Sequence, residues 1–498
     1  MKPFSYLTLS PLALVAFSAS VHAVSFEAPT PFFQSATCAT DNTGENPQCG
    51  FVEVPENRKK PNGPKVKLAV MKFTRHDLTS QEEPIVFLHG EGAGSLSFDG
   101  VKGSDFNSKV AAFLEKRDVI LFDQRGIGQS LPSLNCHEFS DRIVPNEEHP
   151  EVMHFVHRED YMPAMLDAAK ACAKRLRDSG IELEAYNSNE NADDVDDIRR
   201  ALGIKVWSIT GSSYGSRLGL NVIRRHPKSV HAAVLSSVLP PQLDFDTEGR
   251  LARLEKSYFS RNPDVEPLLQ KLTPLLNQAP ITLKTLAIDS YSVKSVPWLF
   301  SGDQLSGLLY GALYSPKSVA GFKTLLTNLD QGNLNGLDVE VTQNTVIPVE
   351  LTNLGFFFAF DCNDTFSHAS KAEIQKNIDA NPEIGPLMYG RDLAWGAEFI
   401  DMCHLFVDPR AATPHFRTPV KSSIPVLFIS GEFDPATPPE NADLAAKTLS
   451  NSQVVVVPGG GHDSMFGGPC PIALTRDFLN SPFQKVDQSC LSAQADAQ

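Results

Sequence analysis

A serine flanked by glycines is the part of this sequence best suited to chemistry: Gly211-Ser212-Ser213-Tyr214-Gly215. It follows an apolar stretch, residues 206–210, and precedes a segment typical of a helix, residues 216–226. Between a strand and a helix, G-x-S-x-G is the pattern of a sharp turn that exposes the serine hydroxyl, and glycine fits there because it has no Cβ. We therefore predict that Ser213 is a nucleophile and that the backbone N–H of Tyr214 faces a developing oxyanion.

Two later segments could activate this serine, because its hydroxyl needs a base to take the proton and a third group to orient that base. Apolar residues 426–429 precede Ser430-Gly431-Glu432-Phe433-Asp434, and residues 454–457 precede Pro458-Gly459-Gly460-Gly461-His462. Loops at the carboxyl ends of strands supply such groups in an open α/β sheet. We predict that His462 is the base and that Asp434 orients it, with Glu432 as the competing acid.

A glycine-rich loop after the apolar residues 84–88 could complete the oxyanion site. It reads His89-Gly90-Glu91-Gly92-Ala93-Gly94-Ser95. Stabilising an oxyanion takes two donors, so we predict that the backbone N–H of Glu91 acts together with that of Tyr214. The competing interpretation is an ordinary glycine-rich turn.

The elements that must position these residues follow from apolar patterning. Strands are predicted over residues 51–54, 65–73, 84–88, 119–122, 206–209, 232–235, 426–429 and 454–457, with helices over 107–116, 161–176 and 192–202. Buried strands alternating with helices indicate an α/β fold with a mostly parallel sheet covered on both faces. The chain order Ser213, Asp434, His462 is that of an α/β-hydrolase.

The alternation of strands and helices stops near residue 241 and resumes at residue 424. We therefore predict a core formed by residues 24–241 and 423–498, with residues 242–422 inserted as a large, mainly helical cap. A separate, sequential domain is the alternative. The return of strand patterning after the insertion favours the cap.

The N-terminus and the cysteines both indicate export. Lys2, the apolar residues 7–17 and the small residues around Val21-His22-Ala23 predict a secretory signal peptide over residues 1–23, although a buried helix is the alternative. Eight cysteines behind such a segment favour disulfides over buried thiols. Our hypothesis pairs nearest neighbours along the chain: Cys38–Cys49, Cys136–Cys172, Cys362–Cys403 and Cys470–Cys490. The expected location is secreted or periplasmic.

Charge narrows the possible partners. The chain carries 44 Lys and Arg against 59 Asp and Glu, for a formal net charge of −15. This balance disfavours nucleic acid and anionic lipid and is compatible with cationic ligands, including peptides with a free amino terminus. No segment is long and apolar enough to predict stable membrane insertion, and the oligomeric state is left open.

Several motifs together resemble those of prolyl-iminopeptidase-like serine peptidases, and most of all their secreted tripeptidyl-aminopeptidase branch. They are the loop at His89, the segment Asp123-Gln124-Arg125-Gly126-Ile127-Gly128-Gln129-Ser130, the serine pentapeptide, and the segments around Asp434 and His462. The resemblance covers residues 49–239 and 422–490. It implies an enzyme that removes residues from peptide N-termini without a metal or organic cofactor, with the cap selecting substrates.

Two positions depart from the family pattern. Glu91 replaces the second glycine of the loop, and its side chain could bind a substrate ammonium or face solvent. Ser236-Ser237 stands where the family often has Asp-Gly, which we interpret as a packing change.

An exopeptidase must also bind a free ammonium, which buried carboxylates can do through charge-assisted hydrogen bonds. Asp361 and Asp364 are candidates because aromatic residues flank them; the competing interpretation is a cap-core segment tied by Cys362.

The function predicted from these observations is a serine aminopeptidase that acts through an acyl-enzyme. The fold and the three catalytic groups do not separate amide from ester hydrolysis, so a carboxylesterase or lipase is the main alternative. A non-catalytic binding protein on the same scaffold is less favoured, because the three groups are all present.

Overall fold

The computed structural model describes most of the chain outside its N-terminus. The described residues are 31–38, 45–90, 110–143, 158–243, 258–260, 262–288, 293–313, 316–342, 353–366, 370–380, 398–411, 416–434, 436–462 and 464–495. The predicted signal peptide lies outside them. So do Glu91 and the rest of the glycine-rich loop beyond Gly90.

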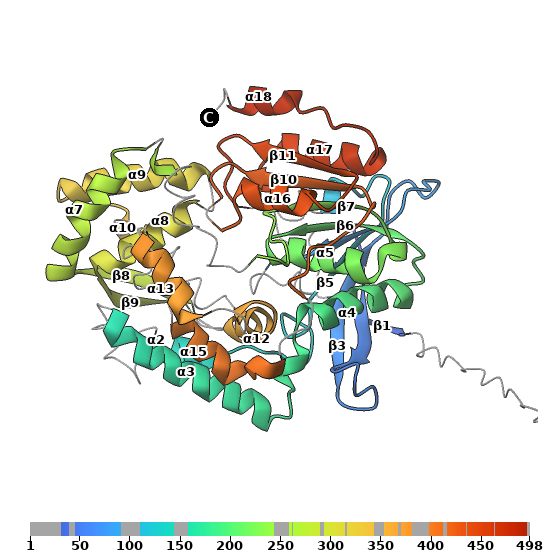
Figure 1. Ribbon diagram of the computed structural model, residues 1–498, viewed down its shortest axis with the longest axis horizontal. Coiled ribbons are helices and arrows are strands. Elements are labelled where there is room, and N and C mark those ends of the chain that lie inside the picture. Colours follow the sequence, from blue (N-terminus) through green and yellow to red (C-terminus); the bar gives the residue numbers. More distant parts are fainter. Residues whose placement is uncertain are drawn as a thin grey trace, which may run out of the picture. The chain divides into compact units, whose positions relative to one another are not determined.

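Among the described residues, nine strands form one sheet in the order β1-β2-β3-β5-β4-β6-β7-β10-β11 (Figure 1). From β5 to β11 every neighbouring pair is parallel, whereas β1, β2 and β3 add an antiparallel edge. The predicted α/β fold with a mostly parallel sheet is thereby confirmed. The strands are β1 Phe33–Ala36, β2 Gln48–Pro55, β3 Lys65–Phe73, β4 Ile85–Leu88, β5 Val119–Phe122, β6 Trp207–Ser212, β7 Val230–Ser236, β10 Val426–Gly431 and β11 Ser452–Val457.

Alternate residues of the central strands enter two different hydrophobic clusters, because successive side chains of a strand point to opposite faces. Val86 and Leu88 of β4 belong to one cluster, with residues of α4 (Ser188–Ala201) and α5 (Tyr214–Arg225). Ile85 and Phe87 belong to the other, with residues of α17 (Pro469–Asn480). Helices therefore cover both faces, which explains why β4 is apolar at every position.

The segment between β7 and β10 is mainly helical, as predicted for the cap, and also holds one antiparallel hairpin, β8 (Ile281–Ile288) with β9 (Val293–Phe300). The boundaries at residues 241 and 422 stay a prediction. The described residues of this segment include the helices α7 Val265–Gln278, α8 Leu305–Leu313, α9 Pro316–Asp330, α10 Leu337–Val341, α12 Leu354–Asp364, α13 Lys371–Ala380 and α15 Glu398–Phe406.

Two helices that precede β6 in the chain pack with the helices of this insertion. They are α2 (His137–Ile143) and α3 (Arg158–Asp178), and α3 packs against α15, which in turn packs against α12 (Figure 1). Disulfides fasten this group, since Cys136–Cys172 joins the start of α2 to α3, and Cys362–Cys403 joins α12 to α15.

The other two disulfides are Cys38–Cys49 and Cys470–Cys490, so the hypothesis of nearest-neighbour pairing is confirmed at all eight cysteines. Cys470–Cys490 joins α17 to the C-terminal helix α18 (Ser489–Ala495). Four disulfides are typical of proteins that fold in an oxidising compartment. A search of the described helices finds none long and apolar enough to cross a bilayer.

Candidate active site

Ser213 lies at the sharp turn between β6 and α5 and has a backbone conformation that few residues other than glycine adopt, with φ 56° and ψ −125°. Its neighbours explain how the turn fits. A Cβ on Gly211 would lie 2.5 Å from the carbonyl oxygen of Gly215, and a Cβ on Gly215 would lie 2.1 Å from that of Leu88. The turn therefore requires glycine on both sides of Ser213, as the pentapeptide predicts.

Hydrogen bonds from outside the turn hold this strained geometry. The N–H of Ser213 donates to the carbonyl oxygen of Ser236 at 3.1 Å. The hydroxyl of Ser216 donates to the carbonyl oxygen of Ser213 at 2.6 Å and accepts from the N–H of Leu239 at 2.9 Å. The end of β7 thus fixes the nucleophile's backbone.

One proposed oxyanion donor, Tyr214, lies at this turn, and so does Gly90, the residue that precedes the other. Tyr214 is the first residue of α5, a position where helices leave the N–H without an intrahelical acceptor. A Cβ on Gly90 would lie 3.4 Å from Cβ of Ser213 and 4.0 Å from its Oγ. The chain that leads to Glu91 therefore passes beside the nucleophile, although Glu91 itself lies outside the described residues.

His462 and Asp434 form a hydrogen-bonded pair, with Nδ1 of the imidazole 3.0 Å and 2.9 Å from the two carboxylate oxygens. Asp434 is buried, and its carboxylate also accepts from the N–H of Ala436 and from the N–H and hydroxyl of Thr437. Burial alone raises the pKa of Asp434, but the facing His462 and the bonds from Thr437 outweigh it and hold that pKa below its usual range. An ionised Asp434 keeps the proton of His462 on Nδ1, so Nε2 carries the lone pair that a base needs.

The competing acid, Glu432, has a different partner. Its carboxylate accepts a hydrogen bond from the N–H of Gly459 at 2.8 Å, in the loop that follows β11. Glu432 therefore shapes the loop that carries His462, whereas Asp434 binds the imidazole.

The turn at Ser213 and the segment that follows His462 both bond to Ser236. Strands β6, β7, β10 and β11 are parallel, so the segments after them leave the same edge of the sheet. The carbonyl of Ser236 accepts from the N–H of Ser213, and its hydroxyl accepts from the N–H of Met465, three residues after His462. Ser236, interpreted from the sequence as a packing change, thus bonds to both halves of the candidate site. Sequence reasoning missed this link and the hydroxyl of Thr437 because both depend on tertiary contacts.

Asp361 and Asp364 lie in α12, and both are buried and bonded within the protein. Asp361 Oδ1 accepts from the Arg217 guanidinium at 3.3 Å. Asp364 accepts from the N–H of Ser188 and from its hydroxyl, the latter at 2.5 Å. Cys362, between the two carboxylates, is bonded to Cys403. The structure therefore places both in a packed cap segment that meets α4 and α5.

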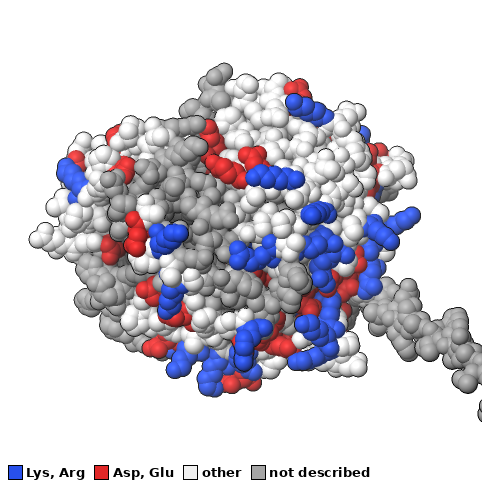
Figure 2. Space-filling model, viewed as in Figure 1, with Lys and Arg blue, Asp and Glu red and all other residues white. Residues whose placement is uncertain are grey.

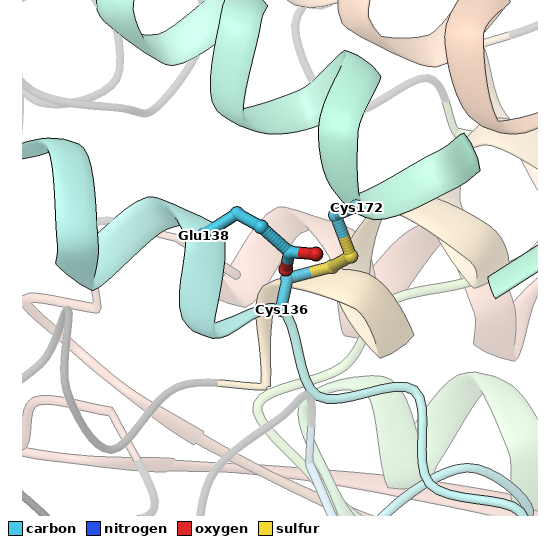
Figure 3. Close-up of side chains that lie close together, drawn as sticks. All are labelled: Cys136, Glu138 and Cys172. Atoms are coloured by element: carbon cyan, nitrogen blue, oxygen red, sulfur yellow. A yellow bond between two sulfur atoms is a disulfide. The ribbon is translucent and has the colours of Figure 1, made fainter. Parts of the chain in front are cut away.

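Within the described part of the chain, one cluster has the residue types of a metal site. Figure 3 shows Glu138 beside Cys136 and Cys172, whose sulfur atoms form a disulfide. A cysteine binds a metal ion as a thiolate, and the sulfur atoms of a disulfide are not thiolates. The carboxylate of Glu138 instead accepts from Arg175 at 2.6 Å and 3.0 Å.

Comparison with known proteins agrees with this fold. A family model described as the alpha/beta hydrolase fold matches residues 83–469, more than half of the chain, so the chain belongs to that family. The putative hydrolase YuaR of Escherichia coli is 23% identical over 476 residues, which cover 89% of this chain and 87% of YuaR. The protein is thus a hydrolase of the α/β-hydrolase fold.

Several relatives are named as peptidases. The tripeptidyl aminopeptidase of Streptomyces lividans is 29% identical over 210 residues, which are 42% of this chain and 38% of that enzyme. The serine protease Hip1 of Mycobacterium tuberculosis is 23% identical over 463 residues, or 84% of this chain and 82% of Hip1. The resemblance to this group of serine peptidases, inferred from the motifs, is confirmed.

Proposed function

We propose that the protein is an exported serine aminopeptidase in which Ser213, His462 and Asp434 form the catalytic triad. The observation that carries this proposal is the hydrogen-bonded pair of His462 and Asp434, whose loop reaches Ser236, the residue that also holds the backbone of Ser213. Similarity to peptidases supports the substrate class. The four disulfides support export, for which residues 1–23 would serve as the signal peptide.

The reaction follows from these roles. Oγ of Ser213 attacks the scissile carbonyl carbon and gives its proton to Nε2 of His462, while the N–H groups of Tyr214 and Glu91 bind the oxyanion. The C–N bond then breaks, and the leaving amine takes the proton from His462. A water molecule attacks the acyl-enzyme, passes a proton to His462, and releases the N-terminal fragment as Ser213 regains its hydrogen. Each step uses only side chains, backbone N–H groups and water.

The free ammonium of the substrate needs a carboxylate near the nucleophile. We favour Glu91 for this role over Asp361 and Asp364, because Glu91 follows Gly90, which lies beside Ser213. The other two carboxylates are buried and already bonded to Arg217 and Ser188.

The experiment that tests this function compares peptides with ester substrates. Fluorogenic peptides with free N-termini should be cleaved, their acetylated counterparts at least about 100-fold more slowly, because the acetyl group removes the recognised charge. Hydrolysis of esters without cleavage of free-amine peptides would establish the carboxylesterase alternative and overturn the proposal.

A fluorophosphonate separates an enzyme from a non-catalytic binding protein, because it reacts with an activated serine. The wild-type protein should be labelled, Ser213→Ala should not be, and His462→Ala should react at least about 1,000-fold more slowly. Wild-type protein that resists labelling would exclude the triad.

A further inference from the structure

A chain of buried hydrogen bonds starts at the cap helix α12 and reaches the side chain of Tyr214. The hydroxyl of Ser188 donates to Oδ2 of Asp364 and lies 2.8 Å from the hydroxyl of Tyr214. The side-chain amide of Asn191 donates to the same Tyr214 hydroxyl at 3.2 Å. All four residues are fully buried, so this chain is closed to solvent.

The chain continues from Tyr214 to the loop that precedes Glu91. The amide of Asn191 also donates to Oε1 of Gln124 at 2.6 Å, and the amide of Gln124 donates to the carbonyl oxygen of His89 at 2.8 Å. Gln124 belongs to the Asp123–Ser130 segment singled out in the sequence, but the proposed chemistry gives it no role. Its two hydrogen bonds connect α4 with the residue next to Gly90.

The donors and acceptors of this chain agree in direction. While Asp364 is ionised, the single proton of the Ser188 hydroxyl is used toward it, so the hydroxyl of Tyr214 then donates to Ser188 and accepts from Asn191. Buried hydrogen bonds of this kind restrict the arrangement of their neighbours. The ring of Tyr214 is further held by edge contacts with Phe356 and Phe360 of α12, at centroid distances of 5.8 Å and 5.4 Å.

We propose that the Tyr214 hydroxyl is a positioning group that, with Ser188, Asn191 and Gln124, fixes the start of α5 relative to His89 and ties it to α12. It thereby holds in place the backbone N–H of Tyr214, one of the two proposed oxyanion donors. Such donors work only when they stand at hydrogen-bonding distance from the developing charge, so small displacements slow the reaction. The inference rests on the proposed acyl transfer at Ser213.

The first test is Tyr214→Phe, which keeps the ring and removes the hydroxyl. It should lower kcat about tenfold, change KM less than about twofold, and slow fluorophosphonate labelling by the same factor as kcat, because the interaction that is lost serves the transition state. Tyr186→Phe is the matched control, since Tyr186 is equally buried and its hydroxyl bonds to Glu56 at 3.1 Å. The control should change neither rate by more than about twofold.

The second test breaks the chain at its other end. Gln124→Met should lower kcat by a similar factor, with Gln304→Met as the control, because Gln304 is buried in the cap and bonds to Trp298 and Leu299. Groups that act through one chain are not independent. The double variant of Tyr214 and Gln124 should therefore be little slower than the slower single variant.

The outcomes separate this inference from the proposed function. Three results would each overturn the inference. They are an unchanged kcat in Tyr214→Phe, a fall in kcat no larger than the loss of folded protein, and a double variant in which the two single effects on kcat multiply. If the wild type is not labelled at Ser213, the proposed function itself fails. If Tyr214→Phe does not fold, Gln124→Met and Ser188→Ala decide the question by the same split between kcat and KM.

Discussion

At the scale of single residues, the nucleophile's turn depends on glycine at position 215. Because a Cβ there would lie 2.1 Å from a backbone oxygen of β4, Gly215→Ala must displace the strand or the start of α5. We expect kcat to fall at least about 100-fold, since small misplacements of reacting groups have such effects. Gly321→Ala is the control: it lies in α9 with nothing within 4 Å, and should be neutral or stabilising. Full activity in Gly215→Ala would contradict this account of the turn.

The buried carboxylate of Asp364 makes stability depend on pH. Burial raises its pKa to about 7, although hydrogen bonds from Ser188 and the nearby Arg217 oppose this and Asp361 adds to it. In the unfolded chain the group titrates near pH 4. Between about pH 4 and pH 7 the folded state therefore holds a proton that the unfolded state has lost, so stability falls as pH rises through this window.

Asp364→Asn removes that titration, so the melting temperature of the variant relative to wild type should rise from pH 4 to pH 7 and then level off. Thermal unfolding of both proteins across this range measures it. Asp178→Asn, at an exposed position of α3, should show no such trend. Parallel curves for Asp364→Asn and wild type would rule out this explanation.

Individual site residues could be predicted only where local sequence specifies their position. Ser213, Asp434 and His462 each follow an apolar strand, and the structure confirms the turn at Ser213 and the pairing of Asp434 with His462. The contacts of Ser236 and Asp364 come from segments far apart in the chain. The aromatic residues that flank Asp364 in α12 pack against α5 and α15, which the local sequence did not show.

At the scale of elements, the central strands were predictable because buried parallel strands are continuous apolar runs. The prediction over residues 119–122 matches β5. The predicted helix over residues 107–116 is only partly present in its described part, since residues 110 and 111 are π-helical and residues 112–116 form turns. The segment ends at Arg117, whose buried guanidinium bonds to Glu83 and to the carbonyl of Leu479, contacts that local periodicity does not contain. The hairpin of β8 and β9 was missed within a segment whose overall pattern is helical.

Buried contacts of Arg125 connect the residue after β2 to α4. Arg125 is fully buried, donates to both carboxylate oxygens of Asp194 at 2.6 Å and 2.7 Å, and donates to the carbonyl of Glu56 at 2.7 Å. Arg125→Met should destabilise the protein by about 3 kcal/mol, because Asp194 and the carbonyl of Glu56 lose buried hydrogen bonds, although Arg58 still pairs with Asp194. Urea unfolding measures the loss. Arg410→Met, which breaks the exposed pair with Asp408, should have no measurable effect. Equal effects of the two variants would refute the distinction.

At the scale of the whole molecule, many acidic side chains are paired with basic ones. On the face shown in Figure 2, Lys and Arg side chains lie among Asp and Glu side chains. Arg58, for example, pairs with Glu190, Asp194 and Asp197, each at 2.7 Å. The net charge of −15 therefore does not imply a single acidic surface on this face. This supports assigning substrate recognition to carboxylates near the nucleophile.

The disulfides should contribute unequally to the stability of the whole chain. A crosslink restricts the unfolded state more when it closes a longer loop, and Cys362–Cys403 spans 41 residues whereas Cys38–Cys49 spans 11. Loop entropy gives about 4 kcal/mol for the first and about 3 kcal/mol for the second. Paired alanine variants of each disulfide, unfolded in urea, measure the two losses. Because Cys362–Cys403 also fastens α12 to α15, its removal should raise KM for peptides, whereas removal of Cys38–Cys49 should not. The opposite result, a KM that rises only when Cys38–Cys49 is removed, would show that the cap helices are held by packing alone.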